Sequence, residues 1–206
     1  MGPGGNRATA ARAATRWSGL AGIAGGALLM LFYTVLIVRQ ALDWRAGPTL
    51  GTSIHLPLMR TISTALLLLI VGLVGLLAAR SNQLGWAAAA GGLLALGGFA
   101  LWAYAAAGNF LPLPLPPWWH PLLFPALVAL GSVVLGSGLV RSRAVPPGGA
   151  LLVGLCGPVG MALLTGPDLT DGLSTAAYTV VRMAGFVAMV LYGSGWIWLG
   201  ESLWRR

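Results

Sequence analysis

Charged residues are scarce in this sequence, and lysine is absent altogether. Only 8% of the 206 residues are charged, whereas 57% are hydrophobic. A water-soluble domain carries about 25% charged residues, so the composition excludes a protein whose surface is mostly wet. Twelve arginines outweigh four acidic residues and give a formal charge of +8. Apart from Arg182, these arginines lie near the ends of hydrophobic stretches, as in membrane proteins, so we expect no nucleic-acid partner.

Groups that bind metals or perform chemistry are almost as rare. Cys156 is the only cysteine, which excludes an intramolecular disulfide and a thiolate metal cluster. His55 and His120 are the only histidines, and no third ligand accompanies them, so we expect no metal and no cofactor. The HExxH and P-loop motifs are missing, and the first five hydrophobic stretches contain no acid. The sequence therefore predicts neither an enzyme nor a proton-coupled transporter.

Long apolar stretches dominate what is present. A helix needs about 20 mostly apolar residues to cross the hydrocarbon layer of a bilayer. Residues 1–16 are polar and arginine-rich, and we predict a disordered tail there, followed by one bundle over 17–206. The predicted fold is all-α, a polytopic transmembrane helix bundle with six spans: Trp17–Val38, Pro57–Ala79, Leu84–Ala107, His120–Val140, Gly148–Thr165 and Leu173–Leu199.

The distribution of arginine predicts the orientation. Cytoplasmic loops of membrane proteins are enriched in basic residues. With the N-terminus inside, only Arg39 and Arg45 fall in outer loops. Eight arginines then lie inside: Arg7, Arg12, Arg16, Arg80, Arg141, Arg143, Arg205 and Arg206. We therefore expect both termini in the cytoplasm and a multi-pass location in a bacterial cytoplasmic (inner) membrane.

Small residues and tryptophans predict how the helices are arranged. Helices in lipid associate through close contacts at small residues, and glycines recur at such spacing, for example Gly22 with Gly26 and Ser132 with Gly136. Tryptophan prefers the membrane boundary. We therefore assign these tryptophans to interfacial belts: Trp17, Trp86, Trp102, Trp118, Trp119, Trp196, Trp198 and Trp204.

Arg182 is the most informative single position, because it lies inside the last predicted span. A guanidinium near the bilayer centre costs about 3 kcal/mol on insertion scales, so it requires a partner. Tyr178 lies one helical turn before it, and Asp168 or Asp171 is the predicted counter-ion. Either Arg182 is satisfied structurally by such neighbours, or it binds an anionic headgroup or carboxylate.

Arg60 stands at the start of the second span, with Ser63 and Thr64 on the same helical face. One interpretation is that its side chain extends to the headgroups at the interface. The other joins Arg60 with Arg182, Asp168 and Asp171 in one outward-facing polar pocket.

The segment Phe110–His120 has proline at alternate positions and ends in Trp118, Trp119 and His120. Proline there favours an extended backbone with few unsatisfied donors. The segment is interpreted either as a stiff connector on the bilayer or as a strip that docks a partner subunit.

Two segments carry a resemblance to a protein family. Residues 138–154, GLVRSRAVPPGGALLVG, resemble the hairpin between the fourth and fifth helices of uncharacterised six-helix bacterial membrane proteins. Residues 16–22, RWSGLAG, are similar to the start of their first span. The resemblance implies the six-helix architecture and brings no activity and no catalytic residues.

Two functions remain after these exclusions. The first is a non-catalytic accessory or assembly subunit of an inner-membrane complex, in contact with the lipid bilayer and with other membrane subunits or copies of itself. The alternative is a small transporter or an anionic lipid- or solute-binding protein that uses an outward-facing pocket at Arg60 and Arg182.

Overall fold

The computed structural model describes residues 3–46, 55–114, 122–166 and 173–205, and within these ranges the chain is helical apart from short connections. All six helices are long and apolar enough to span a membrane. They are α1 (Pro3–Ala46), α2 (His55–Ala79), α3 (Trp86–Ala107), α4 (Leu123–Ser142), α5 (Pro147–Thr165) and α6 (Thr175–Trp204). The predicted all-helical fold of six apolar helices is therefore confirmed.

The helix bounds differ from the predicted spans mainly at the two ends of the chain. Helix α1 begins at Pro3, so residues 3–16 are helical where the sequence predicted a disordered tail. Alanine is the strongest helix former, and this segment is rich in it. Helix α6 continues past Leu199 to Trp204, because no proline interrupts residues 200–204.

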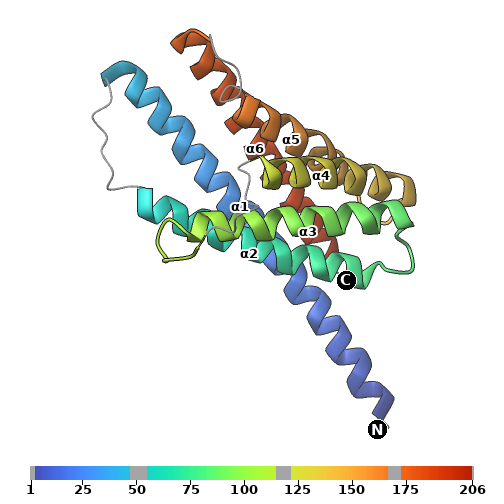
Figure 1. Cartoon of the computed structure of the whole chain (residues 1–206). Coiled ribbons are helices and arrows are strands. Elements are labelled where there is room, and N and C mark those ends of the chain that lie inside the picture. Colours follow the sequence, from blue (N-terminus) through green and yellow to red (C-terminus); the bar gives the residue numbers. More distant parts are fainter. Residues whose placement is uncertain (1–2, 47–54, 115–121, 167–172, 206) are drawn as a thin grey trace.

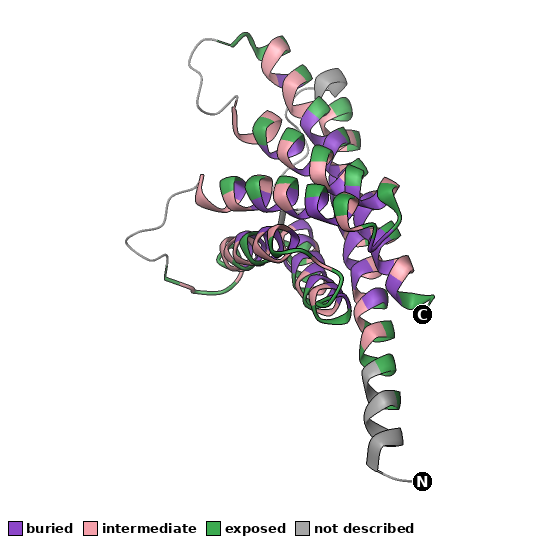
Figure 2. Ribbon diagram, turned by 90° about the vertical axis from the view of Figure 1, so that its right-hand side faces the viewer, coloured by how far each residue is buried: buried purple, intermediate pink, exposed green. Residues whose placement is uncertain are grey.

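The helices form a ring in which each packs against its neighbours in the chain, and α6 closes the ring against α1 (Figure 1). The described connections α2–α3 and α4–α5 lie at the end of the bundle that carries both termini, which we call the termini end. The first turns of α1 project beyond the other helices at this end. Figure 2 shows buried residues along the inner faces of the helices and exposed ones outside.

Glycines set the distance between neighbouring helices, as the sequence predicted. A Cβ at Gly26 of α1 would lie 2.6 Å from the carbonyl oxygen of Gly193 in α6. The same holds between α4 and α5, where a Cβ at Gly136 would lie 2.6 Å from the Cα of Gly154. Such close approach of two backbones is how helices gain packing energy in lipid.

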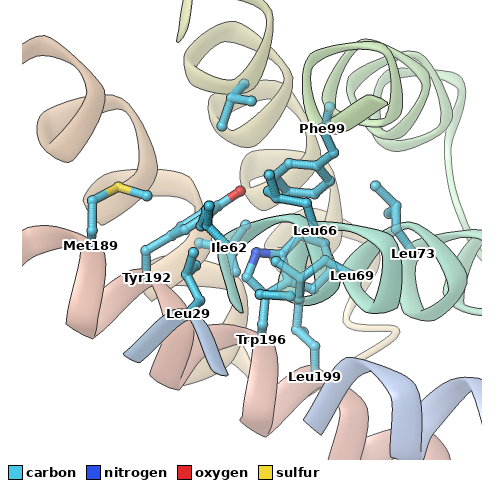
Figure 3. Packing of buried hydrophobic residues seen from close by; sticks show 14 of the residues in the cluster. Leu29, Ile62, Leu66, Leu69, Leu73, Phe99, Met189, Tyr192, Trp196 and Leu199 are labelled. Carbon is cyan, nitrogen blue, oxygen red and sulfur yellow. The ribbon is translucent and has the colours of Figure 1, made fainter. Parts of the chain in front are cut away.

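The centre of the bundle is filled by aromatic residues of α6 and apolar residues of its neighbours (Figure 3). Tyr192 and Trp196 are almost completely buried and contact each other edge to face, and Trp196 also contacts Phe99 of α3 edge to face. Trp196 was predicted to lie in an interfacial belt, and this is wrong, since it is 1% exposed. Trp17, Trp86, Trp198 and Trp204 are exposed, by 44% to 85%, and their assignment to a belt stays a prediction.

Candidate functional site

A groove runs between α2 and α3 at the end of the bundle opposite the termini end. Its volume is about 640 Å³. We call it the α2–α3 groove, and it is lined by Arg60, Ser63, Thr64, Leu67, Ile70, Ala100, Ala103, Tyr104, Ala107, Phe110, Leu111 and Leu113. The α2 residues recur at helical spacing on one face, and α3 faces them with alanines. Because alanine side chains are short, the space between the two helices stays open.

Arg60 provides the only formal charge in this groove. Its guanidinium carbon lies 5.8 Å from the centre of the Phe110 ring, within the range of a cation–π contact. The hydroxyls of Ser63 and Thr64 donate to backbone carbonyls of their own helix, each at 2.9 Å. They therefore do not bind the guanidinium group of Arg60. The groove therefore combines one exposed cation with an almost entirely apolar wall.

No carboxylate neutralises Arg60 among the side chains that the structure describes. Glu201 is the sole acid in that set, and it pairs with Arg205 at the far end of α6, with Nε at 3.0 Å from Oε1. The charge on Arg60 is thus available to an anion from outside the described part of the chain.

The segment after α3 closes one side of the groove. The Tyr104 hydroxyl donates a hydrogen bond to the carbonyl oxygen of Pro114. This bond ties the first prolines of the strip back onto α3, so Phe110 is held beside Arg60. Trp118, Trp119 and His120, the predicted docking strip, lie outside the described residues.

Arg182 lies on α6, seven residues after the helix begins, which places it about 10 Å along the helix axis. The guanidinium Nη1 donates to the Tyr178 hydroxyl at 2.5 Å. Its carbon lies 5.3 Å from the centre of the Tyr178 ring and 5.9 Å from that of Phe186. Buried Nε has no hydrogen-bond partner in the described part of the chain. Tyr178 is therefore the first partner of Arg182, as its spacing predicted.

Arg60 and Arg182 occupy different surroundings. Arg60 faces Phe110 and α3, whereas Arg182 stacks on Phe186, whose ring packs 5.9 Å from that of Tyr33 in α1. The groove at Arg60 contains no residue of α6. Asp168 and Asp171 lie outside the described residues, so the predicted ion pair with Arg182 and the shared pocket stay predictions.

A buried hydrogen bond between α4 and α6 was missed by the sequence analysis. The hydroxyls of Ser132 and Tyr192 lie 3.0 Å apart, and both residues are completely buried. Gly157 of α5 makes room for the pair, since a Cβ there would lie 2.7 Å from the Tyr192 ring. The small-residue spacing of Ser132 and Gly136 pointed to a helix contact but not to its partner.

We expect Ser132→Ala to lower the free energy of unfolding by about 0.6 kcal/mol, the average for a hydrogen bond between membrane helices. Ser137→Ala is the matched control, because Ser137 lies on the same helix, is exposed and donates to its own helix at Val134. SDS-induced unfolding of the two variants in mixed micelles measures the difference. Equal effects in both variants contradict a contribution from the Tyr192 contact.

Metal-binding groups do not gather in the described part of the chain, where no three His, Cys, Asp or Glu residues come together. His55 begins α2, and His120 lies outside the described residues. Cys156 is partly buried in α5 and is not in a disulfide.

No protein-family model, curated protein or solved structure matches this chain. The segment 138–154 forms the junction of α4 and α5, and its resemblance to a family stays a prediction.

Proposed function

We propose that this multi-pass membrane protein binds an anionic lipid in the α2–α3 groove. The observation that carries the proposal is the exposed Arg60, without a carboxylate partner among the described side chains, at one end of a long apolar groove. The lipid headgroup contributes the anion at Arg60, and an acyl chain lies against the alanine face of α3. The role is non-catalytic.

The dimensions support a lipid as the occupant. Arg60 and Ile70 line opposite ends of the α2 side of the groove. Ten residues of helix rise about 15 Å, which is half of the ~30 Å hydrocarbon layer and thus the depth of one leaflet. A soluble anion would contact Arg60 alone and would not contact the apolar walls of the groove.

The excess of arginine near the termini end favours that end in the cytoplasm. Arg60 then faces the outer leaflet of the membrane. We propose the cytoplasmic membrane of a bacterium as its location.

Photocrosslinking tests the groove. We expect phosphatidylglycerol with a diazirine in its acyl chain, in phosphatidylcholine nanodiscs, to label peptides covering residues 60–70 and 100–107. Arg60→Gln should lower this labelling about fivefold, because one basic residue near an anionic lipid contributes about 1 kcal/mol. Mass spectrometry of the labelled peptides measures it.

Matched variants separate binding in the groove from general lipid contact. Ala100→Phe should fill the groove and abolish the labelling, whereas Leu93→Phe, an exposed position of the same helix outside the groove, should not. Unchanged labelling in Arg60→Gln and Ala100→Phe refutes the proposal. Displacement of the lipid by excess inorganic phosphate identifies a site for a free anion instead.

The accessory or assembly role in an inner-membrane complex stays a prediction from the sequence. Purification in mild detergent distinguishes this role from lipid binding. Proteins that co-purify in stoichiometric amounts favour a subunit of a complex, whereas a single species with retained anionic lipid favours lipid binding in the α2–α3 groove.

A further inference from the structure

A second cleft lies at the termini end, between α1 and the last turn of α6. Its volume is about 500 Å³. We call it the termini cleft, and it is lined by Thr9, Arg12, Ala13, Arg16, Trp17 and Trp204. It shares no residue with the α2–α3 groove.

The termini cleft exists because α1 extends beyond the last residue of α6 at this end of the bundle. The two helices cross closely at Gly19, where a Cβ would lie 2.7 Å from both the Gly200 carbonyl oxygen and the Trp204 nitrogen. Helix α6 ends at Trp204, while α1 continues to Pro3 (Figure 1). The turns of α1 that precede Gly19 therefore face the end of α6 with space between them.

Charge in this cleft is entirely positive. Arg12 and Arg16 are exposed and lie four residues apart, so they occupy the same face of α1 and repel each other. Glu201, the only acid among the described side chains, is paired with Arg205 and does not line the cleft. An anion placed between the two guanidinium groups would relieve the repulsion and accept hydrogen bonds from both.

Two exposed tryptophans line the cleft and indicate its depth in a membrane. Trp17 is 68% exposed and Trp204 is 44% exposed. Exposed indoles of membrane proteins lie at the level of the lipid headgroups. Arg16 directly precedes Trp17 and Arg12 lies one turn further toward the N-terminus, so both arginines are then at the height of the headgroup phosphates.

We infer that the termini cleft binds the phosphate of an anionic phospholipid from the leaflet at the termini end. Arg12 and Arg16 hold the phosphate, and Trp17 and Trp204 contact the adjoining glycerol and acyl region. This site is separate from the α2–α3 groove and lies in the opposite leaflet, so it goes beyond the proposed function and stands without it.

Native mass spectrometry of the full chain, released from nanodiscs of phosphatidylcholine and phosphatidylglycerol, tests the inference. Wild type should retain phosphatidylglycerol, and Arg12→Gln/Arg16→Gln should weaken this retention about thirtyfold, because two basic residues near anionic lipid contribute about 1 kcal/mol each. The matched control is Arg141→Gln/Arg143→Gln, which removes the same charge at the same end of the bundle. Circular dichroism confirms that each variant folds.

Three outcomes of this experiment decide whether the termini cleft binds an anionic phospholipid. Equal retention by the cleft variant and its control overturns the inference, because a general surface charge then explains the binding. Displacement of phosphatidylglycerol by excess inorganic phosphate also overturns it, since the site then takes a free anion. Loss of retention in the cleft variant alone, with recovery in Arg12→Lys/Arg16→Lys, supports it. If Arg12→Gln/Arg16→Gln misfolds, a second variant replaces it. Adding Trp17→Ala to Arg12→Lys/Arg16→Lys must then lower the affinity for phosphatidylglycerol.

Discussion

Gly91→Ala is expected to destabilise the bundle by about 1–3 kcal/mol, the usual result of overpacking a close contact. Gly91 of α3 faces α4, and a Cβ there would lie 2.7 Å from the Val134 carbonyl carbon and closer still to the Leu135 nitrogen. These atoms belong to a helix backbone and cannot rotate away. The two helices must therefore separate, and the contacts along the whole α3–α4 interface weaken. SDS-induced unfolding in mixed micelles measures the loss.

Gly97→Ala is the control, because it makes the same change on the same helix. Nothing lies within 4 Å of a Cβ at Gly97, so this variant should be neutral or slightly more stable, as alanine is the better helix former. Gly131→Ala, on the facing helix, should resemble Gly91→Ala, since its Cβ would lie 2.8 Å from the Ala95 Cα. The double variant at 91 and 131 should lose less than the sum, because separated helices accommodate both methyl groups. Equal stability of the 91 and 97 variants refutes this account.

Arg182→Asp is expected to destabilise the protein by about 3–5 kcal/mol, the usual effect of leaving a charge buried without its partner. The reason is the predicted ion pair between Arg182 and Asp168 or Asp171. The described partners of Arg182, the Tyr178 hydroxyl and the faces of two rings, are neutral. A cation inside a membrane span normally also has an anionic partner.

Charge exchange identifies that partner. Asp168→Arg or Asp171→Arg should each be combined with Arg182→Asp, and the true pair should recover most of the stability that the single variants lose. Tyr178→Phe is the control for the neutral contact and should lose only about 1 kcal/mol. The absence of recovery in both combinations contradicts the pairing, and Arg182 is then available to an external anion.

The helical fold was predictable because lipid requires it. A chain that crosses hydrocarbon must satisfy its backbone hydrogen bonds within each segment, and this makes runs of about 20 apolar residues easy to recognise. Even Pro158 did not interrupt α5, which remains one helix. The start of α1 was harder to predict. The alanines of residues 3–16 favour a helix, but this segment is not apolar enough to be recognised as a membrane span.

The interior was less predictable, because composition does not say which helix faces which. Trp196 was assigned to the interface from its place near the end of a span. Its spacing with Tyr192, Leu199 and Leu203 follows a helical face that is buried throughout, and this pattern was available in the sequence. The contact of Trp196 with Phe99 of α3 could not be predicted, because it depends on how two helices that are distant in the sequence are aligned.

The candidate site was predicted in part. Arg60 was recognised from its charge near a membrane boundary, and Tyr178 from its spacing to Arg182. The α2–α3 groove was not recognised, although Ala100, Ala103 and Ala107 recur on one face of α3 and lack the bulk to fill the space. A groove depends on two faces at once, and the face that α2 presents to these alanines required the structure.

The length of α1 has a consequence for labels attached near the two ends of the chain. Its 44 residues make about 66 Å of helix, more than twice the ~30 Å needed to cross the hydrocarbon. Residues 3–16 alone account for about 20 Å, and the first turns of α1 project beyond the other helices (Figure 1). The start of α1 thus lies farther from the body of the bundle than the end of α6 does. A label fused to the start of α1 and one fused after α6 would therefore lie at different distances from the helix bundle.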